Sequence, residues 1–225
     1  LHTEPSPQSP LPITHYPLPI THYPVPSIQY PVPCKLRMKI DPLRIPDVRR
    51  ISTAKHGDSR GFFSEIYSEK EFQLDGLDCN FVQDNYSFSA DAGVLRGLHF
   101  QKPPHAQGKL IRVLSGSIFD VAVDLRVGSP WYGEHVVAEL SANNWQQLWI
   151  PIGFAHGYVT RERNTAVLYK VTDFYYPDLE GGLRWDDSLL NIDWNVDTKK
   201  LTISEKDKYL PTSPDFKSPF SYSSP

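Results

Sequence analysis

The chain contains few residues that could form disulfide bonds, bind zinc or anchor it in a membrane. Only two of its 225 residues are cysteines, Cys34 and Cys79, which excludes a disulfide framework and a zinc site built from cysteines. No run of about 18 apolar residues predicts a membrane span, and there is no basic-then-apolar leader. With 23 Lys and Arg against 26 Asp and Glu, the net charge of −3 gives no electrostatic basis for binding nucleic acid or an anionic membrane. We therefore expect a cytoplasmic protein that binds neither nucleic acid nor a membrane.

Several motifs of common active sites are also missing. No glycine-rich phosphate loop is present, so neither a Rossmann nor a P-loop site is predicted. No serine or cysteine lies in a Gly-x-Ser-x-Gly context, which disfavours a hydrolase nucleophile. The eight histidines include no pair two residues apart, so the compact cluster of a metal-binding jelly roll is not visible. These absences favour acid–base chemistry without a metal or another cofactor.

Residues 1–37 differ in composition from the rest of the chain. They hold 10 of the 21 prolines and none of the 13 glycines, and residues 11–17 are repeated directly as 18–24. Frequent prolines fix φ and remove backbone donors, so this extension is predicted to be extended and without a core, a Pro-rich ligand or spacer being one interpretation. Our hypothesis is that the natural start is Met38, the only methionine. We expect a globular domain over 38–213 and a Ser/Pro-rich tail over 214–225.

Strand signals dominate the predicted domain. Between residues 118 and 127, Phe119, Val121 and Val123 alternate with polar residues such as Asp120 and Asp124, which is typical of a strand. Further strand-like runs cover 61–67, 79–87, 94–101, 109–114, 135–140, 145–150, 157–160 and 165–174. Long amphipathic helical stripes are absent. Many short strands separated by turn residues predict an all-β fold, a jelly-roll β-sandwich or barrel with a few short helices.

One predicted strand carries two side chains suited to chemistry. Arg96 offers a cation for an anionic ligand, and His99 offers an imidazole that can serve as a base. Their spacing of three places them on opposite faces of a regular strand, but Gly97 could host a bulge that turns both to one side. A purely structural histidine is the alternative.

Other segments offer candidate groups, each with an ordinary structural alternative. Lys109 could stabilise negative charge on a reacting oxygen, or it could be a solvated lysine at a strand start. His156 stands in a glycine-bracketed turn, where it could face a ligand or only form local hydrogen bonds. Tyr169 and Tyr175 share a face by alternation, one as a proton donor and one as a stacking surface, or both as core aromatics. The charged residues within 201–207 could lie at the site if the chain folds back to it, or they could form a solvated turn.

Taken together and in order, these segments resemble the dTDP-4-dehydrorhamnose 3,5-epimerase family of the cupin superfamily. The resemblance covers about residues 38–211. It rests on the segments Lys55–Glu65, Phe81–Asn85, Val94–Gln101, Gln107–Val113, Phe119–Arg126, Ile150–Tyr158, Leu168–Tyr175 and Leu201–Asp207. The resemblance implies a cupin-like jelly roll and an isomerase that needs no metal and no redox cofactor.

The implied reaction inverts carbons 3 and 5 of dTDP-4-dehydro-6-deoxy-D-glucose through an enolate. The product is dTDP-4-dehydro-L-rhamnose, in the biosynthesis of dTDP-L-rhamnose. By resemblance, His99 is the general base and Asp207 is its carboxylate partner. Lys109 stabilises the enolate, and Tyr169 returns a proton from the other face.

The resemblance also implies a set of substrate contacts. Tyr175 matches the aromatic side chain that stacks on thymine. The other matching positions are Arg60, Glu65, Gln83, Asn85, Arg96, His156, Glu180 and Lys206. The family is dimeric, so a homodimer is implied, in which Arg60 and Glu65 contribute to the site of the neighbouring subunit.

Three other interpretations remain open from the sequence. An epimerase of a single centre, or a keto-isomerase, would share the fold and much of the site. A non-catalytic jelly roll that binds a nucleotide sugar would be expected to lack the base or the acid, yet His99 and Tyr169 are both present. A metal-dependent cupin oxygenase is the weakest alternative.

Overall fold

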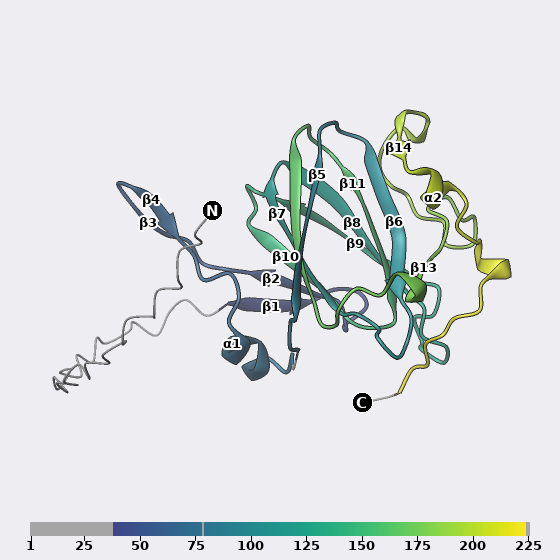
Figure 1. The fold of residues 1–225 in the computed structure, drawn as a ribbon. Coiled ribbons are helices and arrows are strands. Elements are labelled where there is room, and N and C mark those ends of the chain that lie inside the picture. Colours follow the sequence, from purple (N-terminus) through teal and green to yellow (C-terminus); the bar gives the residue numbers. More distant parts are fainter. Residues whose placement is uncertain (1–37, 78, 224–225) are drawn as a thin grey trace, which may run out of the picture. The chain divides into compact units, whose positions relative to one another are not determined.

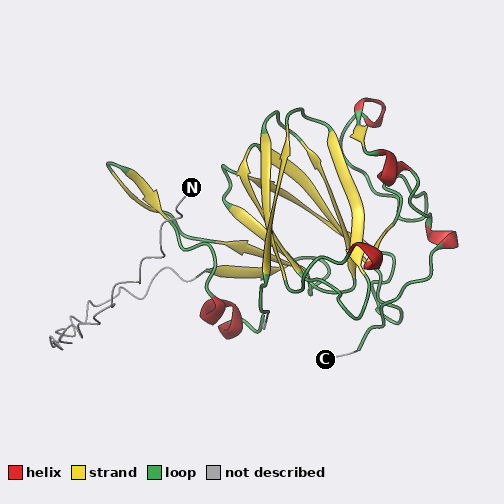
Figure 2. Cartoon of the chain, in the orientation of Figure 1, coloured by secondary structure: helices red, strands yellow, loops and turns green. Residues whose placement is uncertain are grey.

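Two β-sheets that face each other carry most of the regular structure (Figures 1 and 2). The structure is a computed structural model, and it describes residues 38–77 and 79–223. In spatial order, the first sheet contains β1 (Lys39–Pro42), β2 (Arg49–Ser52), β10 (Gln146–Ile150), β7 (Lys109–Ser115), β12 (Thr165–Val171) and β5 (Gln83–Ser89). The second contains β13 (Glu180–Gly182), β6 (Val94–Gln101), β11 (Phe154–Thr160), β8 (Ser117–Asp124) and β9 (His135–Ser141), with β14 (Thr202–Ile203) beside β6.

The remaining elements are short. A separate hairpin joins β3 (His56–Asp58) to β4 (Gly61–Phe63) and projects away from the two sheets (Figure 1). The α-helices are α1 (Glu69–Leu74) and α2 (Glu205–Lys208), and single 3₁₀ turns cover Pro177–Leu179, Thr198–Lys200 and Ser213–Asp215. Within residues 38–77 and 79–223, no helix has the length and apolar content needed to cross a membrane.

Apolar side chains fill the space between the sheets at one end. Ile111 and Val113 of β7 pack with Ile118 and Ala122 of β8 in one buried cluster, which Leu148 of β10 also joins. Because β-strands point alternate side chains to opposite faces, this arrangement uses every second residue of each strand. The predicted all-β jelly roll is confirmed, and the sandwich leaves the other end of the interior for polar side chains.

The outer face of the second sheet is covered by the C-terminal part of the chain. Val121 and Val123 of β8 pack there with Trp194 and Phe220. Phe220 lies within the predicted Ser/Pro-rich tail, yet its side chain is buried. Val127 holds this segment through two backbone hydrogen bonds, one to the carbonyl of Phe220 and one from the amide of Tyr222, each 2.9 Å long. The predicted extension over 1–37 lies outside the described residues.

Most strand predictions agree with the structure. The strand predicted over 94–101 is β6 with the same bounds, and β7, β9 and β10 differ from prediction by one residue at an end. The run over 61–67 is a strand only at Gly61–Phe63, because the chain leaves the hairpin there. Sequence reasoning missed β1 and β2, which have four residues each and too little alternation to stand out.

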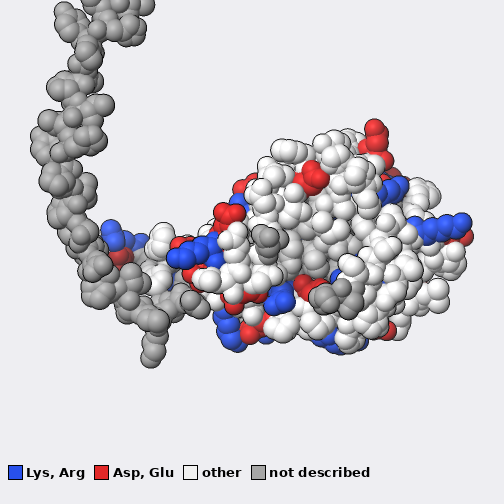
Figure 3. Space-filling view, turned by 90° about the horizontal axis from the view of Figure 1, so that it is seen from below, with Lys and Arg blue, Asp and Glu red and all other residues white. Residues whose placement is uncertain are grey.

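Charged side chains are mixed in sign on the surface. Figure 3 shows one face of the molecule, on which acidic and basic groups are interspersed and a large area is uncharged. The net charge of −3 therefore does not arise from a single acidic field on this face.

Candidate active site

A polar pocket opens between the two sheets. It consists of two adjoining hollows that share three lining residues, His99 of β6, Lys109 of β7 and Tyr169 of β12. One hollow is completed by Gln83, Asn85, Phe100, Gln101, Gln107, Tyr175 and Glu180. The other is lined further by Ser87, Val94, Leu95, Arg96, His156, Tyr158, Thr202, Ile203, Ser204, Lys206 and Asp207.

A β-bulge at Gly97 directs Arg96 and His99 into the same hollow. His99 and Arg96 pair with His156 and Tyr158 of β11, so three steps on β6 match two on β11. Gly97 has a φ of +121°, and a Cβ there would lie 2.6 Å from the Cα of Gly157. Only glycine fits this conformation and this close approach of two backbones. The predicted bulge is confirmed.

His99 is fixed by a carboxylate from the C-terminal region. Its Nε2 lies 2.8 Å from Oδ1 of Asp207 on α2, and the Gly97 amide donates to Oδ2 at 3.2 Å. Burial alone would raise the pKa of Asp207, but the hydrogen bonds from His99 and Gly97 outweigh it and hold the pKa below its usual range. An ionised Asp207 accepts a hydrogen bond from the Nε2–H group of His99, which leaves the lone pair of the imidazole on Nδ1.

Lys109 carries its ammonium to the junction of the two hollows. Its Nζ donates to the backbone carbonyl of His99 at 3.4 Å. Burial lowers the pKa of Lys109 to about 8, although the charges of Asp120 and Glu180 act in the opposite direction. The side chain is therefore a cation near neutral pH, in a place where little water screens it.

His156 is held by a buried carboxylate rather than by its own turn. Its Nε2 lies 3.0 and 3.1 Å from the two oxygens of Asp120 on β8, and Asp120 is fully buried. Asp120 belongs to the face of β8 that the sequence shows as polar. It faces the interior, where His156 supplies its partner.

Tyr169 approaches the pocket from the sheet opposite His99. It lies on β12 of the first sheet, while His99 lies on β6 of the second. Burial raises the pKa of Tyr169, so its hydroxyl keeps its proton at neutral pH. Sequence reasoning missed a nearby hydroxyl pair that also crosses between the sheets, in which Tyr158 Oη lies 2.7 Å from Ser87 Oγ. Only the position of Tyr158 beside His156 could have indicated it.

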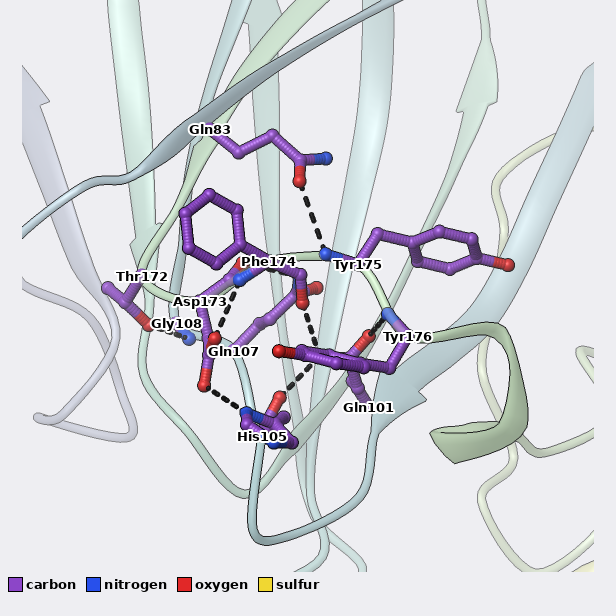
Figure 4. Close-up of polar contacts among 10 residues, drawn as sticks. All are labelled: Gln83, Gln101, His105, Gln107, Gly108, Thr172, Asp173, Phe174, Tyr175 and Tyr176. Atoms are coloured by element: carbon purple, nitrogen blue, oxygen red, sulfur yellow. Dashed lines mark hydrogen bonds and ion pairs between the residues drawn. The ribbon is translucent and has the colours of Figure 1, made fainter.

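A second polar group lines the mouth of the pocket. The Tyr175 hydroxyl donates to Glu180 Oε2 at 3.0 Å, and Lys206 forms an ion pair with the same carboxylate. Burial raises the pKa of Glu180, but the hydrogen bonds from Lys206 and Tyr175 lower it by more than burial raises it. The pKa of Glu180 therefore lies below its usual value. The predicted Gln83 accepts from the backbone amide of Tyr175 at 3.2 Å (Figure 4) and donates to Asn85.

Two predicted binding residues lie outside this pocket. Arg60 stands between the strands of the β3–β4 hairpin, is exposed and pairs with Asp58, while Glu65 follows the hairpin. Neither residue lines the pocket of its own chain. The other eleven predicted site residues line the two hollows.

In the described part of the chain, no group of three or more His, Cys, Asp or Glu is placed to hold a metal ion.

Comparisons with known proteins point in one direction. A family model described as dTDP-4-dehydrorhamnose 3,5-epimerase matches residues 42–215. A dTDP-4-dehydrorhamnose 3,5-epimerase from Sinorhizobium fredii is 50% identical over 175 residues, which cover 78% of this chain and 89% of the relative.

Solved structures have the same fold. A dTDP-6-deoxy-D-glucose-3,5-epimerase from Legionella pneumophila, crystallised with dTDP-4-keto-L-rhamnose, superposes with a TM-score of 0.78 at 40% identity, over 83% of this chain and all of that one. A 3'-monoepimerase from Streptomyces bikiniensis, in complex with dTDP-quinovose, gives a TM-score of 0.70 at 28% identity, over 76% of this chain and 86% of that one.

Proposed function

The chain belongs to the dTDP-4-dehydrorhamnose 3,5-epimerase family, and from this premise we propose how its pocket works as an isomerase. The substrate is dTDP-4-dehydro-6-deoxy-D-glucose, and the product is dTDP-4-dehydro-L-rhamnose in dTDP-L-rhamnose biosynthesis. Similarity to double epimerases at 50% identity, against 28% for the monoepimerase, supports inversion at both carbons.

One observation carries the assignment of catalytic roles. The base candidate His99 and the acid candidate Tyr169 stand on opposite sheets and line one pocket. Inversion of a carbon requires that a proton leaves one face of the sugar and another arrives at the opposite face. Two groups on facing walls meet this requirement for a sugar ring that lies between them.

Each inversion consists of the removal of one proton and the addition of another. Nδ1 of His99 takes the proton from the carbon next to the ketone, and the electron pair of the broken C–H bond moves into the enolate. Lys109 stabilises the charge on the oxygen, and Asp207 stabilises the imidazolium that forms. Tyr169 then donates its proton to the other face of the same carbon, and solvent restores both groups before the second centre reacts.

The remaining pocket residues provide groups for the nucleotide. Arg96, Lys206 and His156 supply donors suited to a diphosphate, the arginine through its planar fork. Tyr175 offers its ring to the thymine at the mouth. Gln83 and Asn85 supply amide groups on the neighbouring wall.

We propose that two copies of the chain assemble through the outer face of the first sheet. Tyr86 and Phe88 of β5 are exposed on this face, and Phe62 and Phe63 are exposed on the hairpin. Large exposed apolar side chains of this kind mark interaction surfaces. A dimer through this face would explain why Arg60 and Glu65 lie away from their own pocket.

The expected cytoplasmic location stays a prediction.

Substitution of the base tests the proposed chemistry. Purified protein is expected to convert the substrate to the epimerised product, and His99→Ala is expected to lose this activity while its affinity for dTDP changes little, because the ring contacts the sugar rather than the nucleotide. Product analysis by NMR and calorimetric titration with dTDP provide the two measurements. Activity that persists in His99→Ala would contradict the assignment of the base.

A further inference from the structure

The five residues 172–176, here called the Tyr175 segment, carry Tyr175 from β12 to the mouth of the pocket. Polar contacts hold this segment along its whole length (Figure 4). The hydroxyl of Thr172 accepts from the Gly108 amide at 2.8 Å, and a carboxylate oxygen of Asp173 lies 3.0 Å from Nδ1 of His105. The ring of His105 stacks on Tyr176 at a centroid distance of 4.0 Å.

Gln101, the last residue of β6, makes the central contacts of this network. Its Nε2 donates to the carbonyl of Phe174 at 2.8 Å and to the carbonyl of His105. Its Oε1 accepts from the amide of Tyr176 at 2.8 Å. Few side chains combine two donors and an acceptor in one planar group, so this amide can tie β6 to two loops at once.

The side chain that makes these contacts is buried. Gln101 is only 4% exposed. Both hydrogens of its amide are used by backbone carbonyls, so the group has no donor left for a ligand, although the side chain lines the pocket. Gln101 therefore acts on the pocket through the segment that it holds.

The ring of Tyr175 depends on this backbone support. It is 51% exposed, and its hydroxyl reaches Glu180 at the mouth of the pocket. A half-exposed ring has few packing neighbours to fix it, so its place is set mainly by the backbone that carries it. Holding the ring in position before binding reduces the entropy that a stacking ligand must lose.

We propose that Gln101 is a positioning residue that holds the Tyr175 segment and thereby sets the affinity for the nucleotide base. This inference rests on the proposed function, in which Tyr175 stacks on thymine. Because Gln101 does not touch the reacting carbons, its loss should weaken binding and leave the chemical step almost unchanged.

Two variants of Gln101 test this role. Gln101→Ala removes all three hydrogen bonds, and the isosteric Gln101→Glu keeps the acceptor but turns an oxygen toward two carbonyls. We expect both to raise the Kd for dTDP and the KM by about tenfold or more, while kcat stays within about threefold. Hydrogen exchange of residues 172–176 should become faster without any ligand, which reports the support directly.

Asp187 provides a matched control. It is also 4% exposed and accepts three backbone hydrogen bonds, from Leu189, Leu190 and Ser213, but it lines neither hollow. Asp187→Ala should loosen its own loop and leave the Kd for dTDP unchanged.

The outcomes separate this inference from the proposed function. Wild-type affinity for dTDP in both Gln101 variants, or an equal loss in Asp187→Ala, would overturn the positioning role. A wild-type chain that binds no dTDP would overturn the proposed function itself. Exchange of the Tyr175 segment at the wild-type rate in Gln101→Ala would show that Gln101 does not hold it.

Discussion

In the proposed mechanism His99 acts as the base, because the residues around it determine which of its nitrogens is free. Asp207 forms a hydrogen bond with Nε2 of His99, and the Gly97 amide helps to keep Asp207 ionised. The imidazole is therefore oriented before any substrate arrives. This preorganisation is what distinguishes His99 from an ordinary histidine in a strand. The two partners are 108 residues apart in the sequence, so no local pattern indicates the pair, and only the resemblance to the family predicted it.

The charge of Lys109 gives a prediction for the dependence of activity on pH. The pKa of Lys109 is lowered to about 8, so the ammonium is present below that pH and lost above it. If the cation stabilises the enolate, kcat/KM should fall about tenfold per pH unit above pH 8. A pH profile of kcat/KM for the free enzyme measures this limb.

Lys109→Arg serves as the control for this limb. Arginine stays charged throughout the accessible pH range. In this variant kcat/KM should therefore no longer fall above pH 8, even if its overall rate is lower. A limb that remains at the same pH in Lys109→Arg would show that another group titrates there.

At the scale of elements, the bulge of β6 turns a strand into one wall of the pocket. Gly97 and Gly157 allow two backbones to approach so closely that the regular register shifts by one residue. Without that shift, Arg96 and His99 would point to opposite sides of the sheet. The bulge therefore links a local glycine to the chemistry of the site.

Substitution of Gly97 tests this link. Gly97→Ala would combine a strained φ of +121° with a Cβ only 2.6 Å from Gly157 Cα. We expect a loss of about 3 kcal/mol or more in the free energy of unfolding, with loss of activity. Thermal or denaturant unfolding measures the first effect, and product formation measures the second.

Gly128→Ala separates the effect of backbone strain from the effect of a steric clash of the added Cβ. Gly128 has a φ of +89°, but among the described residues no atom lies within 4 Å of the added Cβ, so this variant should lose only about 1–2 kcal/mol and keep its activity. Equal effects of the two substitutions would contradict the importance of the close backbone contact.

Strand periodicity made β6, β7 and β8 visible in the sequence, because alternation is a local property. What alternation does not show is the partner of each polar residue. Asp120 and Asp124 mark a polar face that would normally face water, yet both are buried, with His156 and Arg126 as partners. The burial of Phe220 is likewise a long-range contact that composition concealed.

At the scale of the whole molecule, the site residues divide into two groups. Eleven of the thirteen predicted residues line the pocket of their own chain, whereas Arg60 and Glu65 lie at the hairpin. The resemblance to the family, rather than any pattern of residues, predicted this division. The proposed sharing of a site between two copies would account for it.

Mixing two inactive variants tests the shared site. His99→Ala damages a chain's own pocket, and Arg60→Ala should damage the pocket of its neighbour. A mixed dimer would then contain one intact site, so random assembly of equal amounts should restore about a quarter of the wild-type activity. Co-expression with two affinity tags and an activity assay measures this recovery, and no recovery would contradict the sharing of Arg60.

The most direct test of the proposed reaction is proton exchange followed by NMR in heavy water, with dTDP-4-dehydro-6-deoxy-D-glucose as substrate. The proposed double inversion predicts that deuterium enters at both carbon 3 and carbon 5, because one base and one acid on opposite walls serve both carbons next to the ketone. Deuterium at a single carbon, or at neither while dTDP still binds, would contradict it.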